Sequence, residues 1–265
     1  MKKRSQRLNI FTLPYLQQGL ARTSLAQNTP GARFTKDPLL MWVTEQMTVL
    51  AYEYAPDLPE WDFDAATQSS SGIIIWEGST GLNAPMPGPV ARMWGFVIQG
   101  IVWVHADNGT RFFPLGRSQD VFRTPAKLPL VTPPFSYSAA ELAEHLPRLW
   151  AMLGTTLILS DTPTVAAQRT FKPPPPGPTG RAPLHSPVTK VMLRENLPTG
   201  LPATKSEGGE KKWGLKKRHL VRGHWRAQVC GPGRADRRPT FVPPYIKGPA
   251  DAPLVVKPRV HVWGR

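Results

Sequence analysis

The sequence lacks the features that would identify a disulfide-bonded, membrane-spanning or exported protein. Its 265 residues include one cysteine, Cys230, so an intrachain disulfide is excluded. No stretch reaches the roughly 18 consecutive apolar residues of a membrane helix. The apolar run at residues 10–16 is interrupted by Thr12 and Pro14 and is short for a signal peptide. We therefore expect a cytoplasmic protein without a membrane partner.

Familiar catalytic and cofactor-binding motifs are also missing. The chain contains no P-loop, dinucleotide fingerprint, nucleophile elbow or HExxH helix. The spacing of His219, His224, Cys230 and His261 matches no zinc module, and Cys230 lies in a Gly-Pro-Gly turn without an evident base. The acidic residues between 53 and 64 are typical of a solvated loop or an acidic patch. We expect neither a metal nor a cofactor.

Charge is distributed very unevenly along the chain. Acidic residues are absent from residues 1–36, which carry +7. Residues 37–171 carry −6 and residues 172–265 carry +14, for a net charge of +15. Such asymmetry indicates a polyanionic partner, most often nucleic acid. An acidic protein is the alternative partner, and tails that only keep the chain soluble are the plain interpretation.

Two helical segments and a group of strands predict an α+β fold. Residues 37–55 predict a helix with Asp37 as its cap and Pro38 in the first turn, and residues 138–153 predict a second one that begins with a capping box. Between them, residues 72–115 predict antiparallel strands rich in tryptophan, with a hairpin turn at Asp-Asn-Gly. We expect a Trp-rich antiparallel β-core, two principal helices and a basic C-terminal β-module.

Composition suggests four parts. Proline is abundant, with 31 residues, and it is concentrated in a stretch typical of extended polyproline II structure. The expected parts are a basic flexible arm (1–36), an α+β core (37–170), a proline-rich linker or insertion (171–187), and a basic β-module (188–265) with a mobile loop at 196–214.

The stretch "RHLVRGHWRAQV" has the alternation of an amphipathic strand. If residues 219–229 form a strand, Val221, Trp225 and Val229 face inward, and a cationic row faces outward. The Pro243-Pro244 pair in the next strand confines that strand to a sheet edge. The product is a small basic β-module.

Three functions suit this module. The first is nucleic-acid binding through phosphate contacts, because Lys and Arg neutralise phosphates and Arg adds bidentate hydrogen bonds. The second is metal-independent RNA cleavage, with His224, His219 and His261 as candidate acids or bases. The third is a structural or protein-interaction role. The residues predicted to bind nucleic acid are Lys216, Lys217, Arg218, Arg222, His224, Arg226, Arg234, Arg237, Arg238 and Lys247.

The runs "VTKVMLR" and "RHLVRGHWRAQVCGPGRADRRPTFVPPYIKGPADAPL" resemble a group of uncharacterised actinobacterial proteins associated with phages or plasmids. Their shared pattern is a V-R-G-H-W-R core, a Gly/Arg-rich turn and a proline-interrupted "PYIKGP" segment. The similarity covers residues 188–263, and more weakly the arrangement of residues 36–160. It implies a mobile-element setting and assigns the strand at 188–195 to the terminal module. Cys230 departs from the pattern, which has an aromatic residue there, and 171–187 looks like an insertion.

Overall fold

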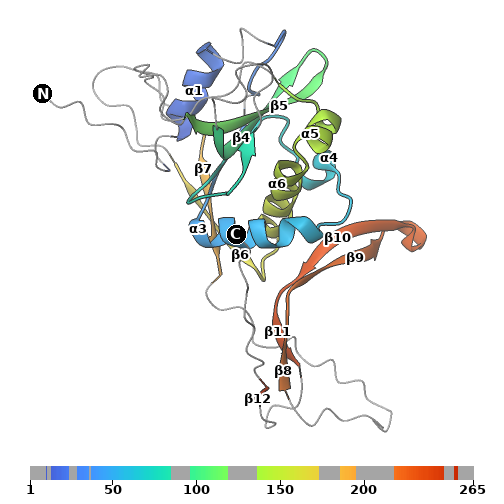
Figure 1. Cartoon of the computed structure of the whole chain (residues 1–265). Helices are drawn as coiled ribbons and strands as arrows, with labels where there is room; N and C mark the ends of the chain where they lie inside the picture. The colour runs from blue at the N-terminus through green and yellow to red at the C-terminus, as the bar shows by residue number, and fades with distance from the viewer. Residues whose placement is uncertain are drawn as a thin grey trace, which may run out of the picture. The chain divides into compact units, whose positions relative to one another are not determined.

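The chain forms two compact units, Met1–Leu193 and Arg194–Arg265, in the computed structural model. Each is described here by itself (Figure 1). The described residues are 10, 13–23, 29–35, 37–84, 96–118, 136–172, 186–194, 218–247 and 254–255. Within these ranges, every helix is too short or too polar to cross a membrane.

The first unit is built on a mixed seven-stranded sheet. Its strand order is β3-β4-β2-β1-β7-β6, and β5 pairs with β4. β1 runs parallel to β2 and β7, whereas the pairs β2–β4, β3–β4, β4–β5 and β6–β7 are antiparallel. The strands are β1 (Leu39–Val43), β2 (Gly72–Trp76), β3 (Asn83–Ala84), β4 (Phe96–Ala106), β5 (Gly109–Ser118), β6 (Ala166–Phe171) and β7 (Val188–Leu193).

Helices cover both faces of this sheet (Figure 1). Adjacent strand residues show this, because Trp42 packs in the cluster that includes α1, whereas Met41 accepts a contact from Ser160 of α6. On that second face, the Trp76 indole N–H also donates to Thr156 Oγ1 at 3.0 Å. The helices are α1 (Leu13–Thr23), α3 (Glu45–Tyr54), η2 (Ala55–Asp57), α4 (Phe63–Ala66), α5 (Ala139–His145) and α6 (Pro147–Ser160).

An aromatic cluster fills the space between the sheet and the helices α4 and α6. Trp61 and Trp150 lie with ring centroids 4.3 Å apart, and Phe63 meets Trp103 and Phe112 edge to face at 5.7 and 4.9 Å. Such edge-to-face pairs add to the burial of apolar area. The predicted α+β class with a Trp-rich core is confirmed, and the sheet is mixed because β1 adds two parallel pairs.

Two predicted local signals are confirmed. Ser138 and Glu141 form the reciprocal hydrogen bonds of a capping box at the start of α5. The Asp-Asn-Gly turn joins β4 to β5, with the positive φ at Gly109 (99°). Pro147 separates α5 from α6 and occupies the first turn of α6, where its missing N–H is tolerated. The segment "TTLILS", residues 155–160, is the end of α6.

The helix predicted over residues 37–55 is wrong in its first part. Leu39–Val43 is the strand β1, and the helix α3 begins at Glu45 after Thr44 rather than after Asp37. The segment "LLMWV" shows no alternation because both faces of β1 are covered, and a strand buried on both sides is apolar at every position. The strand was therefore indistinguishable from the first turns of an apolar helix.

Residues 13–23 lie within the expected flexible arm, 1–36, but they are helical. These residues form α1, and Leu13, Leu16 and Leu20 are fully buried against the sheet. The spacing of these leucines is helical. Pro14 lies in the first turn of the helix, a position where proline is tolerated, so it does not argue against α1.

The boundary between the units also differs from the expected one. Residues 188–193 form β7, which pairs with β1 and β6 in the large sheet and not with the C-terminal strands. Their position between two strands of the first unit sets the division after Leu193. Most of the proline-rich segment 171–187 and the whole loop 196–214 lie outside the described residues.

Candidate nucleic-acid interface

The second unit contains a long antiparallel hairpin over residues 218–247, called the basic ribbon below (Figure 1). β9 pairs with β10, and β8 pairs with β11. A fifth short strand, β12, runs parallel to β8. The strands are β8 (Arg218–Val221), β9 (His224–Cys230), β10 (Asp236–Val242), β11 (Tyr245–Lys247) and β12 (Leu254–Val255).

One register runs through the whole hairpin. Val221 faces Tyr245 in the β8–β11 pair, and His224 faces Val242 in the β9–β10 pair, so two residues intervene on each strand. On one strand these are Pro243 and Pro244, which have no N–H to donate to a ladder. The single strand predicted over 219–229 is therefore divided at Arg222-Gly223 opposite the two prolines, without a shift of register.

The two sides of the β9–β10 ribbon differ in chemistry. Residues that face each other across an antiparallel pair share a side, and neighbours in a strand lie on opposite sides. The polar side carries His224, Arg226, Gln228, Asp236, Arg238 and Thr240, together with Cys230 and Val242. The apolar side carries Trp225, Ala227, Val229, Arg237, Pro239 and Phe241.

An aromatic contact organises the apolar side. The rings of Trp225 and Phe241 meet at 67° with centroids 5.2 Å apart, and Phe241 is 3% exposed. This agrees with the inward orientation predicted for Trp225 and leaves little of this pair for stacking on bases. The arginines of the ribbon are consequently its main groups for contacting a polyanion.

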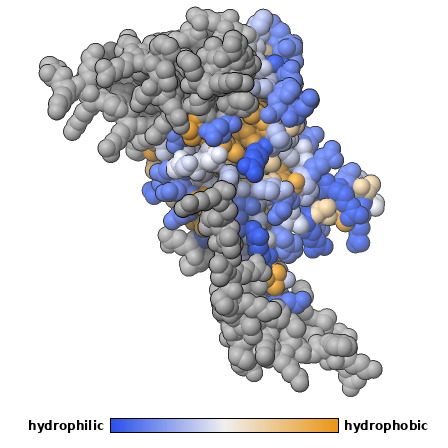
Figure 2. Space-filling model, in the orientation of Figure 1, coloured by the Kyte–Doolittle hydropathy of each residue, from blue (hydrophilic) through white to orange (hydrophobic). Residues whose placement is uncertain are grey.

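The ribbon carries a strong excess of positive charge. Residues 218–247 contain seven Lys and Arg residues and one acid, Asp236. Each arginine of the β9–β10 ladder faces a neutral residue, which avoids like-charge opposition across the strands. The described residues include no ion-pair partner for Arg226, Arg234, Arg237 or Arg238. Figure 2 shows the ribbon as a mainly hydrophilic surface.

The tip of the ribbon is a short glycine-rich turn. Gly231, Gly233 and Arg234 all have positive φ, at 77°, 64° and 60°. Glycine adopts this region without a steric penalty, whereas arginine does not. The turn exposes Arg234 at the end of the ribbon.

Among the candidate catalytic residues, the structure describes the side chain of His224 only. It is exposed, and its Nδ1 lies 3.2 Å from the carbonyl oxygen of Arg222. A hydrogen bond from Nδ1–H leaves Nε2 as the proton acceptor of the neutral ring. Five further predicted site residues have side chains that the structure does not describe: His219, His261, Lys216, Lys217 and Arg218.

Three polar residues on the polar side of the ribbon were not predicted as site residues: Gln228, Asp236 and Thr240. Thr240 joins it through the pairing with Arg226, and Gln228 lies there opposite Arg238. The alternation within "HWRAQV" already places Gln228 beside Arg226. The position of Thr240, and the separation of Arg237 from Arg238, depend on the cross-strand register, which a tight turn of unknown length leaves open.

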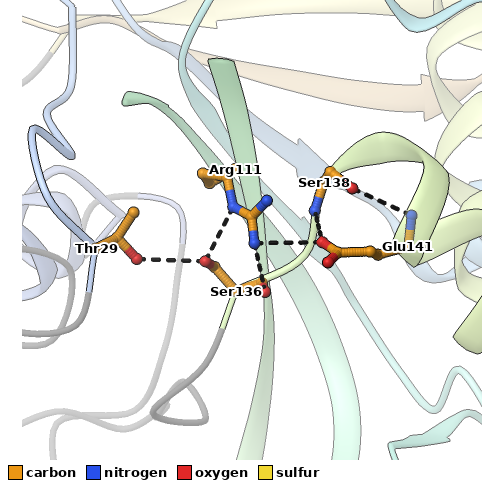
Figure 3. A network of polar contacts seen from close by, with 5 residues as sticks. All are labelled: Thr29, Arg111, Ser136, Ser138 and Glu141. Atoms are coloured by element: carbon orange, nitrogen blue, oxygen red, sulfur yellow. Dashed lines mark hydrogen bonds and ion pairs between the residues drawn. The ribbon is translucent and has the colours of Figure 1, made fainter. Parts of the chain in front are cut away.

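A second polar constellation lies in the first unit, where Arg111 of β5 meets the start of α5 (Figure 3). Arg111 Nε and Nη2 donate to Ser136 Oγ and O at 3.1 and 2.9 Å, and Nη2 lies 3.3 Å from Glu141 Oε2. The Ser138 N–H donates to Glu141 Oε2 at 2.6 Å.

These contacts shift two pKa values. Hydrogen bonds from the Ser138 backbone and side chain, then the charge of Arg111, lower the pKa of Glu141. Burial, and then the charge of Glu141, raises the pKa of Tyr137. This network fastens α5 to the β4–β5 hairpin.

Two adjoining cavities of about 450 and 530 Å³ lie beside the start of α6. They share Leu82, Pro147 and Arg148 as lining residues, and they add His145 on one side and Glu53 on the other. No group of three His, Cys, Asp or Glu side chains suited to a metal ion occurs in the described part of the chain. The basic ribbon remains the region with the most distinctive chemistry.

Comparison with known proteins adds no assignment. No protein-family model and no curated protein matches the chain. The resemblance to phage- and plasmid-associated proteins therefore rests on the residues quoted for it.

Proposed function

We propose that the chain is a nucleic-acid-binding protein that contacts phosphates through the basic ribbon. The observation that carries this proposal is a row of exposed arginines on an extended hairpin, with no ion-pair partners for Arg226, Arg234, Arg237 and Arg238 among the described residues. Arginines held apart on a rigid ladder retain their full charge for an external polyanion. A duplex presents one phosphate per ~1.7 Å of its axis, so several arginines bind at once.

The arginine side chain suits a phosphate partner. Its planar guanidinium forms two parallel hydrogen bonds with a phosphate, which a lysine ammonium does not. All six cationic residues between positions 218 and 238 are arginines. Five of them have exposed side chains: Arg222, Arg226, Arg234, Arg237 and Arg238. The resemblance to phage- and plasmid-associated proteins suggests an accessory or regulatory role on a mobile element.

The test measures binding of labelled duplex DNA and single-stranded RNA by the full chain and by two charge-matched double variants. Arg226→Gln with Arg238→Gln removes two charges from the ribbon, and Arg148→Gln with Arg169→Gln removes two exposed charges from the first unit. We expect the ribbon variant to bind about tenfold or more weakly, because each charge-assisted hydrogen bond contributes about 1.5–3 kcal/mol. The control variant should bind like the wild type.

Equal affinities for wild type and the ribbon variant would contradict the proposal, as would the absence of binding to either nucleic acid. The same samples report RNA cleavage, since intact and cut strands separate on a gel. Cleavage that is lost in His224→Ala would instead assign the ribbon to the ribonuclease alternative, with the exposed His224 as its acid or base.

A further inference from the structure

The polar side of the ribbon holds more than phosphate-binding groups. Gln228 faces Arg238 across the ladder, and Arg226 faces Thr240 two positions further along the same side. Arg226 and Arg238 are therefore diagonal neighbours, about 7–8 Å apart at the backbone, with Gln228 beside both. The Gln228 amide is uncharged: its Nε2 donates to the Val229 carbonyl oxygen at 3.4 Å, and its amide oxygen Oε1 adds an acceptor beside the two arginines.

These side-chain types are the ones that recognise base edges in a major groove. Arginine forms two hydrogen bonds with O6 and N7 of guanine, and glutamine does the same with N6 and N7 of adenine. Threonine contacts either a polar base edge or the thymine methyl group. The polar side thus combines donors and acceptors that distinguish base pairs, whereas the apolar side carries only Arg237 among apolar residues.

The dimensions of the ribbon select one kind of groove. Paired strands lie about 4.8 Å apart, and the ~12 Å major groove of B-DNA admits a two-stranded β-ribbon. The minor groove is only about 6 Å wide, and the major groove of A-form RNA is too narrow for side chains to read. Seven residues of β9 extend about 24 Å, which is enough to follow several base pairs.

From these observations we infer that the polar side of the β9–β10 ribbon enters the major groove of duplex DNA and reads base edges through Arg226, Gln228 and Arg238. The inference rests on the nucleic-acid-binding function proposed above. It assigns duplex DNA as the ligand and sequence-specific recognition as the mode. The apolar side then faces away from the base pairs.

Arg237 and Arg238 provide a matched test, because they are adjacent, exposed and on opposite sides of the ribbon. A random-sequence duplex pool is first enriched on the wild-type protein. Affinities at one salt concentration are then measured for an enriched duplex, an unrelated duplex and the RNA duplex of the enriched sequence. The proteins are the wild type, Arg238→Ala, Arg237→Ala and Gln228→Ala, each checked for an unchanged circular dichroism spectrum.

We expect the wild type to prefer the enriched DNA over both other duplexes. Arg238→Ala and Gln228→Ala should each lose about 5- to 150-fold of that preference, which is the range for one bidentate base contact. Arg237→Ala should weaken binding to all duplexes equally and keep the preference. Three results would overturn the inference while leaving salt-dependent binding intact. These are the same loss of preference in the Arg237 and Arg238 variants, equal affinity of the wild type for the DNA and RNA duplexes, and a pool from which no sequence is enriched. Failure to bind any nucleic acid would overturn the proposed function as well.

Discussion

Arg234 carries a backbone conformation that its side chain disfavours. It is the only non-glycine residue with positive φ among the described residues, at 60°. The left-handed region costs a residue with a Cβ about 1–2 kcal/mol, and such strain in native proteins is found where a side chain is needed for function. Arg234 is exposed at the tip of the ribbon, and under the function proposed above we expect its guanidinium to contact a phosphate.

Replacement of Arg234 by glycine should therefore stabilise the ribbon and weaken binding. The relieved strain exceeds the ~0.5–1 kcal/mol that glycine loses in chain entropy, so the net gain is about 0.5–1 kcal/mol. Amide hydrogen exchange over residues 224–242 should slow about two- to fivefold, while affinity for duplex DNA falls. Arg237→Ala removes the same charge from an ordinary strand position and should not slow exchange. Faster exchange in Arg234→Gly would contradict the account of strain.

At the scale of elements, the capping box that fastens α5 makes a pH-dependent contribution to stability. The pKa of Glu141 is held below its ordinary value of 4.5, chiefly by the hydrogen bond from the Ser138 backbone. A carboxylate with a lowered folded pKa stabilises the protein fully above its ordinary pKa, and this contribution is lost as pH falls through the lowered value.

Glu141→Gln is expected to lower the midpoint of urea unfolding near pH 7 and to lose this deficit in acid. The difference from wild type should stay constant while pH is well above 4.5, and it should shrink progressively below that value. Glu144→Gln, a neutralisation at an exposed position of the same helix, serves as the control for the loss of one negative charge. A wild-type advantage that persists unchanged at the lowest pH would contradict the role of the ionised carboxylate.

Short sequence motifs predicted an element correctly where the motif is compatible with only one local structure. The capping box at Ser138 and the hairpin at Gly109 are such cases, because each depends on residues within four positions of one another. β1 was mistaken for helix because burial on both faces removes the alternation that marks a strand. α1 was missed because Pro14 suggests a break, although the first turn of a helix tolerates it.

At the scale of the whole molecule, the sequence predicted a basic β-module but not its form. The alternation in "HWRAQV" placed Arg226 and Gln228 on one side, and this is how β9 presents them. The pairing that adds Arg238 and excludes Arg237 is a long-range property, and one residue of slip would exchange the two arginines. The assignment of residues 188–193 to the large sheet likewise depends on contacts with β1 that local patterns do not contain.

The salt dependence of duplex DNA binding by the wild-type chain tests the central claim most directly. Each phosphate neutralised by an arginine releases counterions and contributes about −0.9 to the slope of log affinity against log salt concentration. Arg234 and Arg237 alone, or together with Arg226 and Arg238, would make two to four phosphate contacts, so we predict a slope between about −1.8 and −3.6 from 50 to 200 mM salt. A slope near zero, or no binding at the lowest salt, would contradict a nucleic-acid-binding ribbon.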